Sequence, residues 1–310
     1  PPPLFQAEDG IRDTRTCLVG SEMCIRDRYV PPDLVKQMSL DPENYSLASR
    51  KEELSVLFTD IRGFTTISEG LEADELSALM DEYLTPMTRI VHDTRGTIDK
   101  YIGDAVMAFW GAPVPTPDHA DRAVEAGLAM LNALDELNAD FAEKGWPEVR
   151  IGVGVNTGVM SVGNMGSAFR RAYTVLGDAV NLGSRLESIT KAYGVSFIVN
   201  ETTAAAAPRY AYRELDRVKV KGKDKPVTIL EPVGVRDELD EEALGKIEAF
   251  HRFLALYRSQ AWDEAQQALN ELRSSCGDCT LFDLYEQRID TFHKEPPPAE
   301  WDGVFVHTSK

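Results

Sequence analysis

The spacing of hydrophobic positions predicts alternating strands and helices over most of the chain. An apolar run over residues 54–58 predicts a strand, and the i, i+3, i+4, i+7 spacing over 76–91 predicts an amphipathic helix. Residues 97–110 predict a hairpin, and the alternation over 149–155 predicts another strand. We therefore expect helices packed on a mostly antiparallel sheet, which is an α+β fold.

Turn signals and further apolar runs extend this pattern. The hairpin is expected to turn at Gly103-Asp104, and residues 156–158 are expected to turn the next strand back. A second helix is predicted over 117–144, and a third begins near Asp178. Further strands are predicted at 197–199, 212–220 and 227–230.

The pattern becomes entirely helical after Gly234. Short apolar faces over 235–294 resemble tetratricopeptide-type helix pairs, and fewer than three such repeats are not stable alone. This helical tail is therefore expected to pack on the main domain or on a partner. Residues 295–310, which contain three prolines, predict an extended C-terminus.

The first 28 residues have neither helical nor strand periodicity. They resemble peptides that arise when sequencing-adapter DNA is translated, so we exclude 1–28 from fold reasoning as a disordered artefact. Residues 29–53 are predicted to be a polar linker, followed by a main domain at 54–234. A sensor or membrane anchor upstream of the linker is expected.

Composition and charge exclude several classes of function. The 310 residues, 43% hydrophobic and 27% charged, suit about two globular domains. A net charge of -18 argues against nucleic-acid binding, which needs a basic surface. No run of 18 apolar residues occurs, so we expect a cytoplasmic protein that reaches a membrane only through such an upstream anchor. Cys276 and Cys279 have a C-x-x-C spacing without a second pair nearby, so we expect two reduced thiols there rather than a zinc or redox site.

Two aspartates are the first candidates for chemistry. Asp60 ends the strand at 54–58, and Asp104 lies in the turn of the predicted hairpin. Carboxylates at strand ends can reach hard divalent cations such as Mg²⁺ or Mn²⁺. Each aspartate alone is also an ordinary turn residue, because Asp favours turns through local hydrogen bonds. The motifs around them favour the metal-binding interpretation.

Residues 54–233 resemble the catalytic domain of class III adenylate and guanylate cyclases. This resemblance implies a ferredoxin-like, palm-type core that works as a homodimer, with active sites built from both chains. The five segments that carry it, in order along the chain, are 58–65, 99–104, 156–158, 173–186 and 220–223.

The resemblance also implies roles for individual residues. Asp60, Ile61 and Asp104 hold two divalent cations, Asn181 orients the ribose, and Arg185 stabilises charge on the α-phosphate. The remaining roles concern the triphosphate and the base. Gly63, Phe64, Thr65 and Lys221 bind the triphosphate, with Lys223 as an alternative to Lys221, and Lys100 and Thr174 read the base.

The pair that reads the base favours ATP as substrate. A lysine can donate to N1 of adenine, and a threonine hydroxyl can accept from its exocyclic amine. Guanylate cyclases of the family have Glu where Lys100 stands, and Thr174 replaces the commoner Asp. The sequence therefore predicts an adenylate cyclase that forms cyclic AMP and pyrophosphate. A guanylate cyclase and a non-catalytic nucleotide-binding signalling domain are the alternatives; the Gly-Gly-Asp/Glu-Glu-Phe signature of diguanylate cyclases does not occur.

Overall fold

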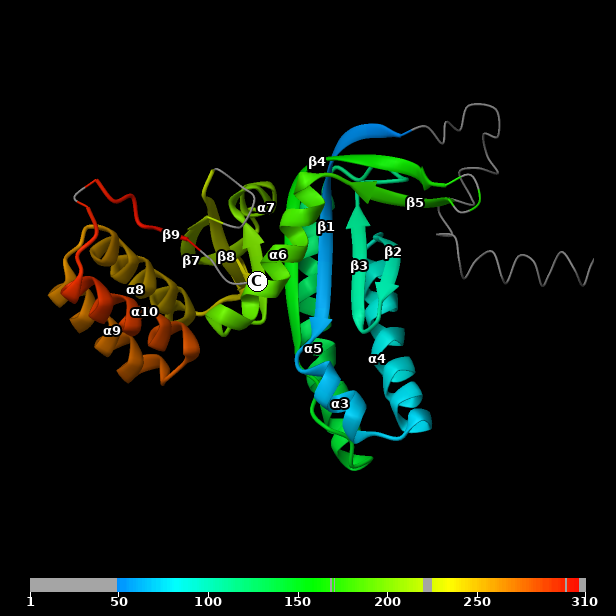
Figure 1. Cartoon of the computed structure of the whole chain (residues 1–310), viewed down its shortest axis with the longest axis horizontal. Helices are drawn as coiled ribbons and strands as arrows, with labels where there is room; N and C mark the ends of the chain where they lie inside the picture. The colour runs from blue at the N-terminus through cyan, green and yellow to red at the C-terminus, as the bar shows by residue number, and fades with distance from the viewer. Residues whose placement is uncertain (1–48, 168, 170, 220–224, 299, 307–310) are drawn as a thin grey trace, which may run out of the picture. The chain divides into compact units, whose positions relative to one another are not determined.

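The computed structural model describes residues 49–167, 169, 171–219, 225–298 and 300–306. The stretch 1–28 that we interpreted as an artefact, and most of the predicted linker, lie outside these residues. Apart from residues 113–115, the described residues belong to one structural unit. Figure 1 labels the helices and strands of this unit, and the same labels are used below.

A mixed sheet of nine strands runs through the described part of the chain. Its order is β2-β3-β1-β4-β6-β8-β7-β9, and β5 pairs with β4. Only β4–β6 and β7–β9 are parallel among these neighbours. The strands are β1 Arg50–Ile61, β2 Thr97–Ile102, β3 Ala105–Trp110, β4 Ile151–Gly166, β5 Arg171–Leu176, β6 Phe197–Asn200, β7 Tyr210–Lys219, β8 Val227–Val235 and β9 Val304–Val306.

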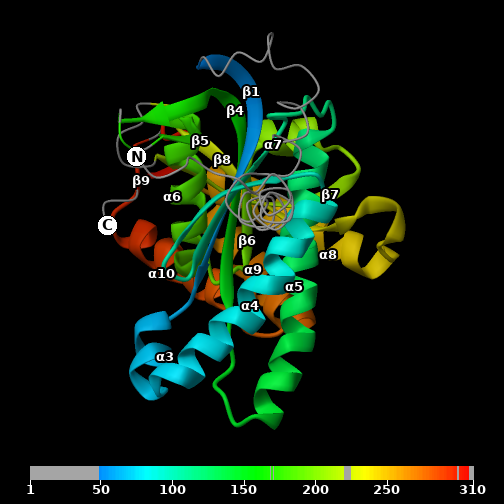
Figure 2. The same ribbon diagram turned by 90° about the vertical axis from the view of Figure 1, so that its right-hand side faces the viewer.

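Helices cover both faces of this sheet (Figure 2). Side chains of a strand alternate between faces, so Leu57 of β1 joins the core under α4 and α5, while Val56 lies against α6. The prediction of an α+β fold is confirmed, although helices do not keep to one side. The helices are α3 Phe64–Gly70, α4 Ala73–Asp93, α5 His119–Glu143, α6 Asp178–Tyr193, α7 Glu201–Ala206, α8 Glu241–Arg258, α9 Trp262–Cys276, α10 Thr280–Lys294 and a short 3-10 helix Arg236–Glu238.

The turn predicted at residues 156–158 is wrong, because β4 continues through it to Gly166. All three residues pair with β1, and their polar side chains find partners inside the fold. Asn156 donates from Nδ2 to the carbonyl of Ala179 at 2.7 Å, and the hydroxyls of Thr157 and Ser55 lie 2.7 Å apart. Polar residues that usually indicate a turn are therefore buried strand residues here.

Two segments differ from the boundaries expected from sequence. β1 begins at Arg50, inside the range assigned to the linker, because residues 50–53 pair with β4. In the range expected to be extended, Val304–Val306 forms β9 and pairs in parallel with residues 217–219 of β7. The last strand therefore lies beside the strand that precedes the lysine-rich segment.

The C-terminal helices share a hydrophobic core with the sheet and α6. Phe250 and Phe253 of α8 and Tyr285 of α10 lie in one cluster with Leu186 of α6 and Leu215 of β7. The helical tail therefore packs on the main domain. This packing satisfies the need of a short helical array for a neighbouring apolar surface.

Candidate active site

The two candidate metal-binding aspartates lie together at one end of the sheet. Asp60 is next to last in β1, and Asp104 follows Gly103 in the tight turn between β2 and β3. Gly103 has φ 66°, a left-handed conformation that glycine adopts without strain. The backbone N–H of Ile61 donates to Oδ2 of Asp104 at 3.0 Å, which joins the end of β1 to this turn.

The electrostatics of this pair suit a hard cation. Burial and the charge of Asp104 raise the pKa of Asp60 to about 6. Within the described residues neither carboxylate forms an ion pair with a cationic side chain. Carboxylate oxygens are the ligands that Mg²⁺ and Mn²⁺ prefer. Among the described residues, no group of three or more His, Cys, Asp or Glu side chains has an arrangement that could hold a metal ion.

A third carboxylate, Glu187 of α6, lies behind the pair and was not predicted from sequence. Burial and the charge of Asp60 raise the pKa of Glu187 to about 7, while Arg62 acts against this shift. Its side chain lies over Gly152, which is the partner of Asp60 in the β1–β4 register. The only sequence signal for Glu187 is its position two residues after Arg185, inside a segment already singled out.

The turn proposed to bind the triphosphate follows directly on β1. Gly63 has φ 70° and precedes α3, and its carbonyl accepts from the backbone N–H groups of Thr66 and Ile67 at 2.9 and 3.3 Å. Phe64 packs against the main core, whereas Thr65 is exposed. The turn is therefore anchored by one side chain, and its polar edge faces solvent next to the aspartates.

The two residues predicted to read the base are joined by a third, Asp99. Asp99 lies at an irregularity in the pairing of β2 with β3, and such bulges re-aim side chains. Its carboxylate is fully buried and accepts from the Thr174 hydroxyl and, at 3.4 Å, from the backbone N–H of Val175. Nζ of Lys100 lies 2.9 Å from its other oxygen. Asp99 thus connects β2 with β5 and contacts both side chains that are predicted to read the base.

This arrangement fixes the hydrogen-bonding character of Thr174. A hydroxyl has one proton and two acceptor lone pairs. Since Thr174 donates its proton to Asp99, its oxygen can only accept from a ligand. Lys100, whose side chain is about half exposed (47%), is free to donate beyond Asp99. The pair therefore presents one donor and one acceptor, as adenine requires.

Asn181 and Arg185 lie one helical turn apart on α6, and glycines seat this helix on the sheet. A Cβ on Gly154 of β4 would lie 2.2 Å from the backbone nitrogen of Glu187 and 2.7 Å from the carbonyl of Gly183. Only a strand without a side chain at this position lets α6 approach so closely. The glycines thereby fix the height of both polar side chains above the sheet.

Arg185 has a buried nitrogen, Nη1, without a hydrogen-bond partner in the described part of the chain. A buried donor without a partner is costly, so this one is expected to find its acceptor in a ligand or a second chain. No hydrogen bond or ion pair among the described residues joins Arg185 or Asn181 to Asp60 or Asp104. Lys221 and Lys223, predicted to reach the phosphates, lie outside the described residues.

The sequence matches the family model described as the adenylate and guanylate cyclase catalytic domain over residues 47–230. This match covers more than half of the chain, so the chain belongs to that family. The resemblance inferred from the motifs is therefore confirmed, and it places the acid pair and α6 within a nucleotide cyclase domain.

Named relatives include adenylate cyclases from bacteria. "Adenylate cyclase 1" of Rhizobium meliloti is 37% identical over 208 residues, covering 67% of this chain and 31% of the relative. The adenylate cyclase of Anabaena cylindrica is 34% identical over 215 residues, covering 66% of this chain and 42% of that protein. The chain thus spans less than half the length of either relative.

Solved structures of both nucleotide specificities are similar. The adenylyl cyclase CyaB from P. aeruginosa is 37% identical with a TM-score of 0.58, covering 62% of this chain and 100% of that one. The guanylyl cyclase Cya2 is 35% identical with a TM-score of 0.56, covering 62% of this chain and 97% of that one. Overall similarity therefore does not distinguish ATP from GTP as the substrate. That distinction has to come from the local geometry of the site.

Across the described residues, none of the helices combines the length and the apolar character needed to cross a membrane.

Proposed function

We propose that this chain is an adenylate cyclase that converts ATP to cyclic AMP and pyrophosphate. The observation that supports the choice of ATP is the hydrogen bond that the Thr174 hydroxyl donates to the buried Asp99 carboxylate. Thr174 then accepts from the exocyclic amine of adenine, and Lys100 donates to its N1. Guanine presents an acceptor where Thr174 needs a donor, and an unpaired buried polar group costs about 1–3 kcal/mol.

The acid pair would hold the cations of the reaction. Asp60, Asp104 and the main-chain oxygen of Ile61 are the ligands in this proposal, and the raised pKa of Asp60 supports it. Two divalent cations, Mg²⁺ or Mn²⁺, supply activation of the ribose 3′-hydroxyl and neutralisation of the leaving pyrophosphate when bound. The turn at Gly63, Phe64 and Thr65 lies beside the pair and binds the triphosphate through its exposed edge.

The residues of α6 act on the reacting atoms. Asn181 orients the ribose, and Arg185 donates to the oxygens of the α-phosphate as charge builds up there. A preorganised donor of this kind is worth about 3–4 kcal/mol in the transition state. Lys221 supports the leaving phosphates. The unpartnered Nη1 of Arg185 supports this role, because that nitrogen lacks an acceptor within the described chain.

A homodimer would bring the two half-sites together. The acid half comprises Asp60 and Asp104, and the donor half comprises Lys100, Thr174, Asn181, Arg185 and Lys221. Large hydrophobic side chains are exposed on the elements that carry the donor half. Tyr101 and Ile102 lie on β2, Val159 on β4, Leu176 on β5, and Phe169 in the connection between β4 and β5. An apolar surface of this kind favours an interface with a second copy.

The experiment that tests this function is a product assay. The purified protein is incubated with ATP or GTP, first with Mg²⁺ and then with Mn²⁺, and cyclic AMP and cyclic GMP are measured. Cyclic AMP as the predominant product supports the proposal. Predominant cyclic GMP indicates a guanylate cyclase, which the similarity to Cya2 keeps as the second candidate. Nucleotide binding without either product indicates a non-catalytic domain.

A further inference from the structure

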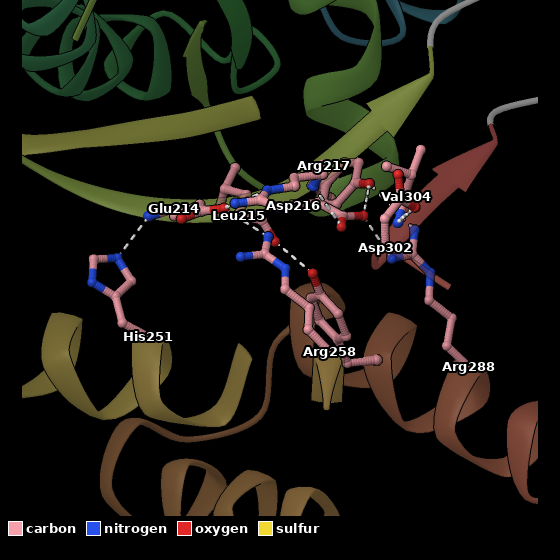
Figure 3. A network of polar contacts seen from close by, with 11 residues as sticks. Glu214, Leu215, Asp216, Arg217, His251, Arg258, Arg288, Asp302 and Val304 are labelled. Atoms are coloured by element: carbon pink, nitrogen blue, oxygen red, sulfur yellow. Dashed lines mark hydrogen bonds and ion pairs between the residues drawn. The ribbon is translucent and has the colours of Figure 1, made fainter. Parts of the chain in front are cut away.

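A buried ion pair connects the C-terminal tail to the main domain. Arg288 of α10 donates from Nη1 to Oδ2 of Asp216 on β7 at 2.7 Å, and the two side chains are only 5% and 1% exposed. Figure 3 shows this contact beside a second one, in which Arg258 of α8 reaches Glu214. The guanidinium of Arg288 also stacks on the ring of Phe305 in β9, 3.6 Å from its centroid.

Tyr193, the last residue of α6, is hydrogen-bonded to both members of this ion pair. The hydroxyl of Tyr193, which ends α6, donates to Oδ2 of Asp216 at 2.6 Å. Nη2 of Arg288 in turn donates to that hydroxyl oxygen at 3.2 Å. The second oxygen of Asp216 accepts from the backbone N–H of Arg217 at 2.7 Å. The network therefore ties three elements, α6, β7 and α10, at one buried point.

Packing next to the network reinforces the contact with α6. Thr280, the first residue of α10, lies so close to Gly194 that a Cβ there would be 2.4 Å from the Thr280 Cβ. Leu182 and Leu186 of α6 belong to the hydrophobic cluster formed with the tail helices. Each follows Asn181 or Arg185 by one residue, about 100° around the helix, so the tail packs against a face of α6 other than the one that carries the proposed catalytic groups.

The tail also pairs with the C-terminal end of β7, the strand that precedes the lysine-rich segment. β9 pairs in parallel with Arg217, Val218 and Lys219, the last three residues of β7. Lys221 follows two residues later along the chain. The tail thus contacts α6, which carries Asn181 and Arg185, and the strand β7, which precedes Lys221 in the sequence.

We propose that Arg288 is a positioning residue, through which the helical tail holds α6 and β7 so that the donor half of the active site is correctly placed. This inference rests on the proposed composite site. It predicts that the tail of one chain supports the site to which that chain supplies Asn181 and Arg185. It does not support the site to which the chain supplies Asp60 and Asp104.

Mixed dimers with one usable site test this asymmetry. An Asp104→Asn chain supplies only its donor half, and an Arg185→Ala chain supplies only its acid half. The two chains carry different affinity tags, and the heterodimer is purified. Arg288→Met is then placed in either chain, and kcat and KM for ATP are measured.

The expected size of the effect follows from geometry, because displacing catalytic groups by about 1 Å can lower the rate by up to about 100-fold. We expect kcat to fall about 10- to 100-fold when Arg288→Met is in the Asp104→Asn chain, and less than about twofold in the other arrangement.

Two further variants make the outcome decisive. Arg273→Met removes a tail arginine whose ion-pair partners among the described residues are Asp278, Asp283 and Glu286 of the tail itself, so it should leave kcat unchanged in both arrangements. Arg288→Lys keeps the charge but loses the fork that spans Asp216 and Tyr193, and it should give a smaller loss in the same arrangement. If the Arg288→Met chain does not fold, the Arg288→Lys chain is used in its place.

The results separate this inference from the proposed function. Equal losses in both arrangements, loss only in the Arg185→Ala chain, or no loss at all would overturn the positioning role of Arg288. Failure of the parent mixture to recover any activity would overturn the composite site itself, before Arg288 is considered.

Discussion

Thr174 donates its hydroxyl proton to the buried carboxylate of Asp99 across the β2–β5 contact. This bond converts a side chain that could donate or accept into one that only accepts. Lys100, beside the same carboxylate, supplies the complementary donor. In the proposed function, base selection would therefore depend on Asp99, a residue that does not itself need to touch the base.

Asp99→Asn is predicted to weaken the preference for ATP over GTP. An amide in place of the carboxylate can donate to Thr174, which frees the threonine proton to bond the O6 atom of guanine. We expect the ratio of kcat/KM for ATP to that for GTP to fall by about tenfold, equivalent to about 1.4 kcal/mol. Asp93→Asn, at an exposed position at the end of α4, is the control. An unchanged ratio would show that Asp99 does not control the base.

Gly154→Ala is predicted to displace α6 from the sheet. The added Cβ would meet backbone atoms of α6, which cannot move aside as a flexible side chain can. We expect the free energy of unfolding to fall by about 1–3 kcal/mol. The rate should also fall by about 10- to 100-fold, because Arg185 moves with the helix. Gly245→Ala, where the Cβ meets open space in α8, should leave activity unchanged. Denaturant unfolding and a cyclic AMP assay measure both effects.

The buried Glu187 predicts a pH-dependent stability. Its pKa is raised to about 7 from the ordinary value of 4.5, mainly by burial and then by the charge of Asp60. The folded state therefore holds the proton more tightly than the unfolded chain. This contribution to stability is complete below pH 4.5 and is lost as the pH rises through about 7. Without divalent metal, Glu187→Gln should thus stabilise the protein most at pH 8.

The size of this effect follows from the shift. The rise of the pKa from 4.5 to about 7 corresponds to at most about 3 kcal/mol, and partial solvent screening reduces this to about 1–2 kcal/mol. Thermal unfolding in EDTA at pH 5.5 and pH 8 measures the difference between the variant and the native chain. Glu143→Gln, at an exposed position of α5, should give no such difference. A stabilisation by Glu187→Gln that does not grow with pH would contradict this account.

Sequence patterns predicted the long helices and the β2–β3 hairpin, because the apolar spacing of these elements is local. They failed at residues 156–158, because the partners that bury these polar groups lie on β1 and α6, far away in the sequence. Asp99 and Glu187 were missed for a similar reason. From sequence, an acidic residue next to a motif lysine, or two residues after a motif arginine on a helix, is interpreted as a solvent-exposed charge. Only the bulge in β2 and the close approach of α6 to Gly154 bury them.

Complementation between two inactive chains tests the shared active site most directly. Asp104→Asn and Arg185→Ala proteins should each lose at least about 100-fold in kcat, because each lacks one half of both sites. Random exchange of subunits in an equal mixture should restore about a quarter of native cyclic AMP production, since half of the dimers then contain one complete site. A mixture that stays as inactive as its two components would contradict a site built from two copies of this chain.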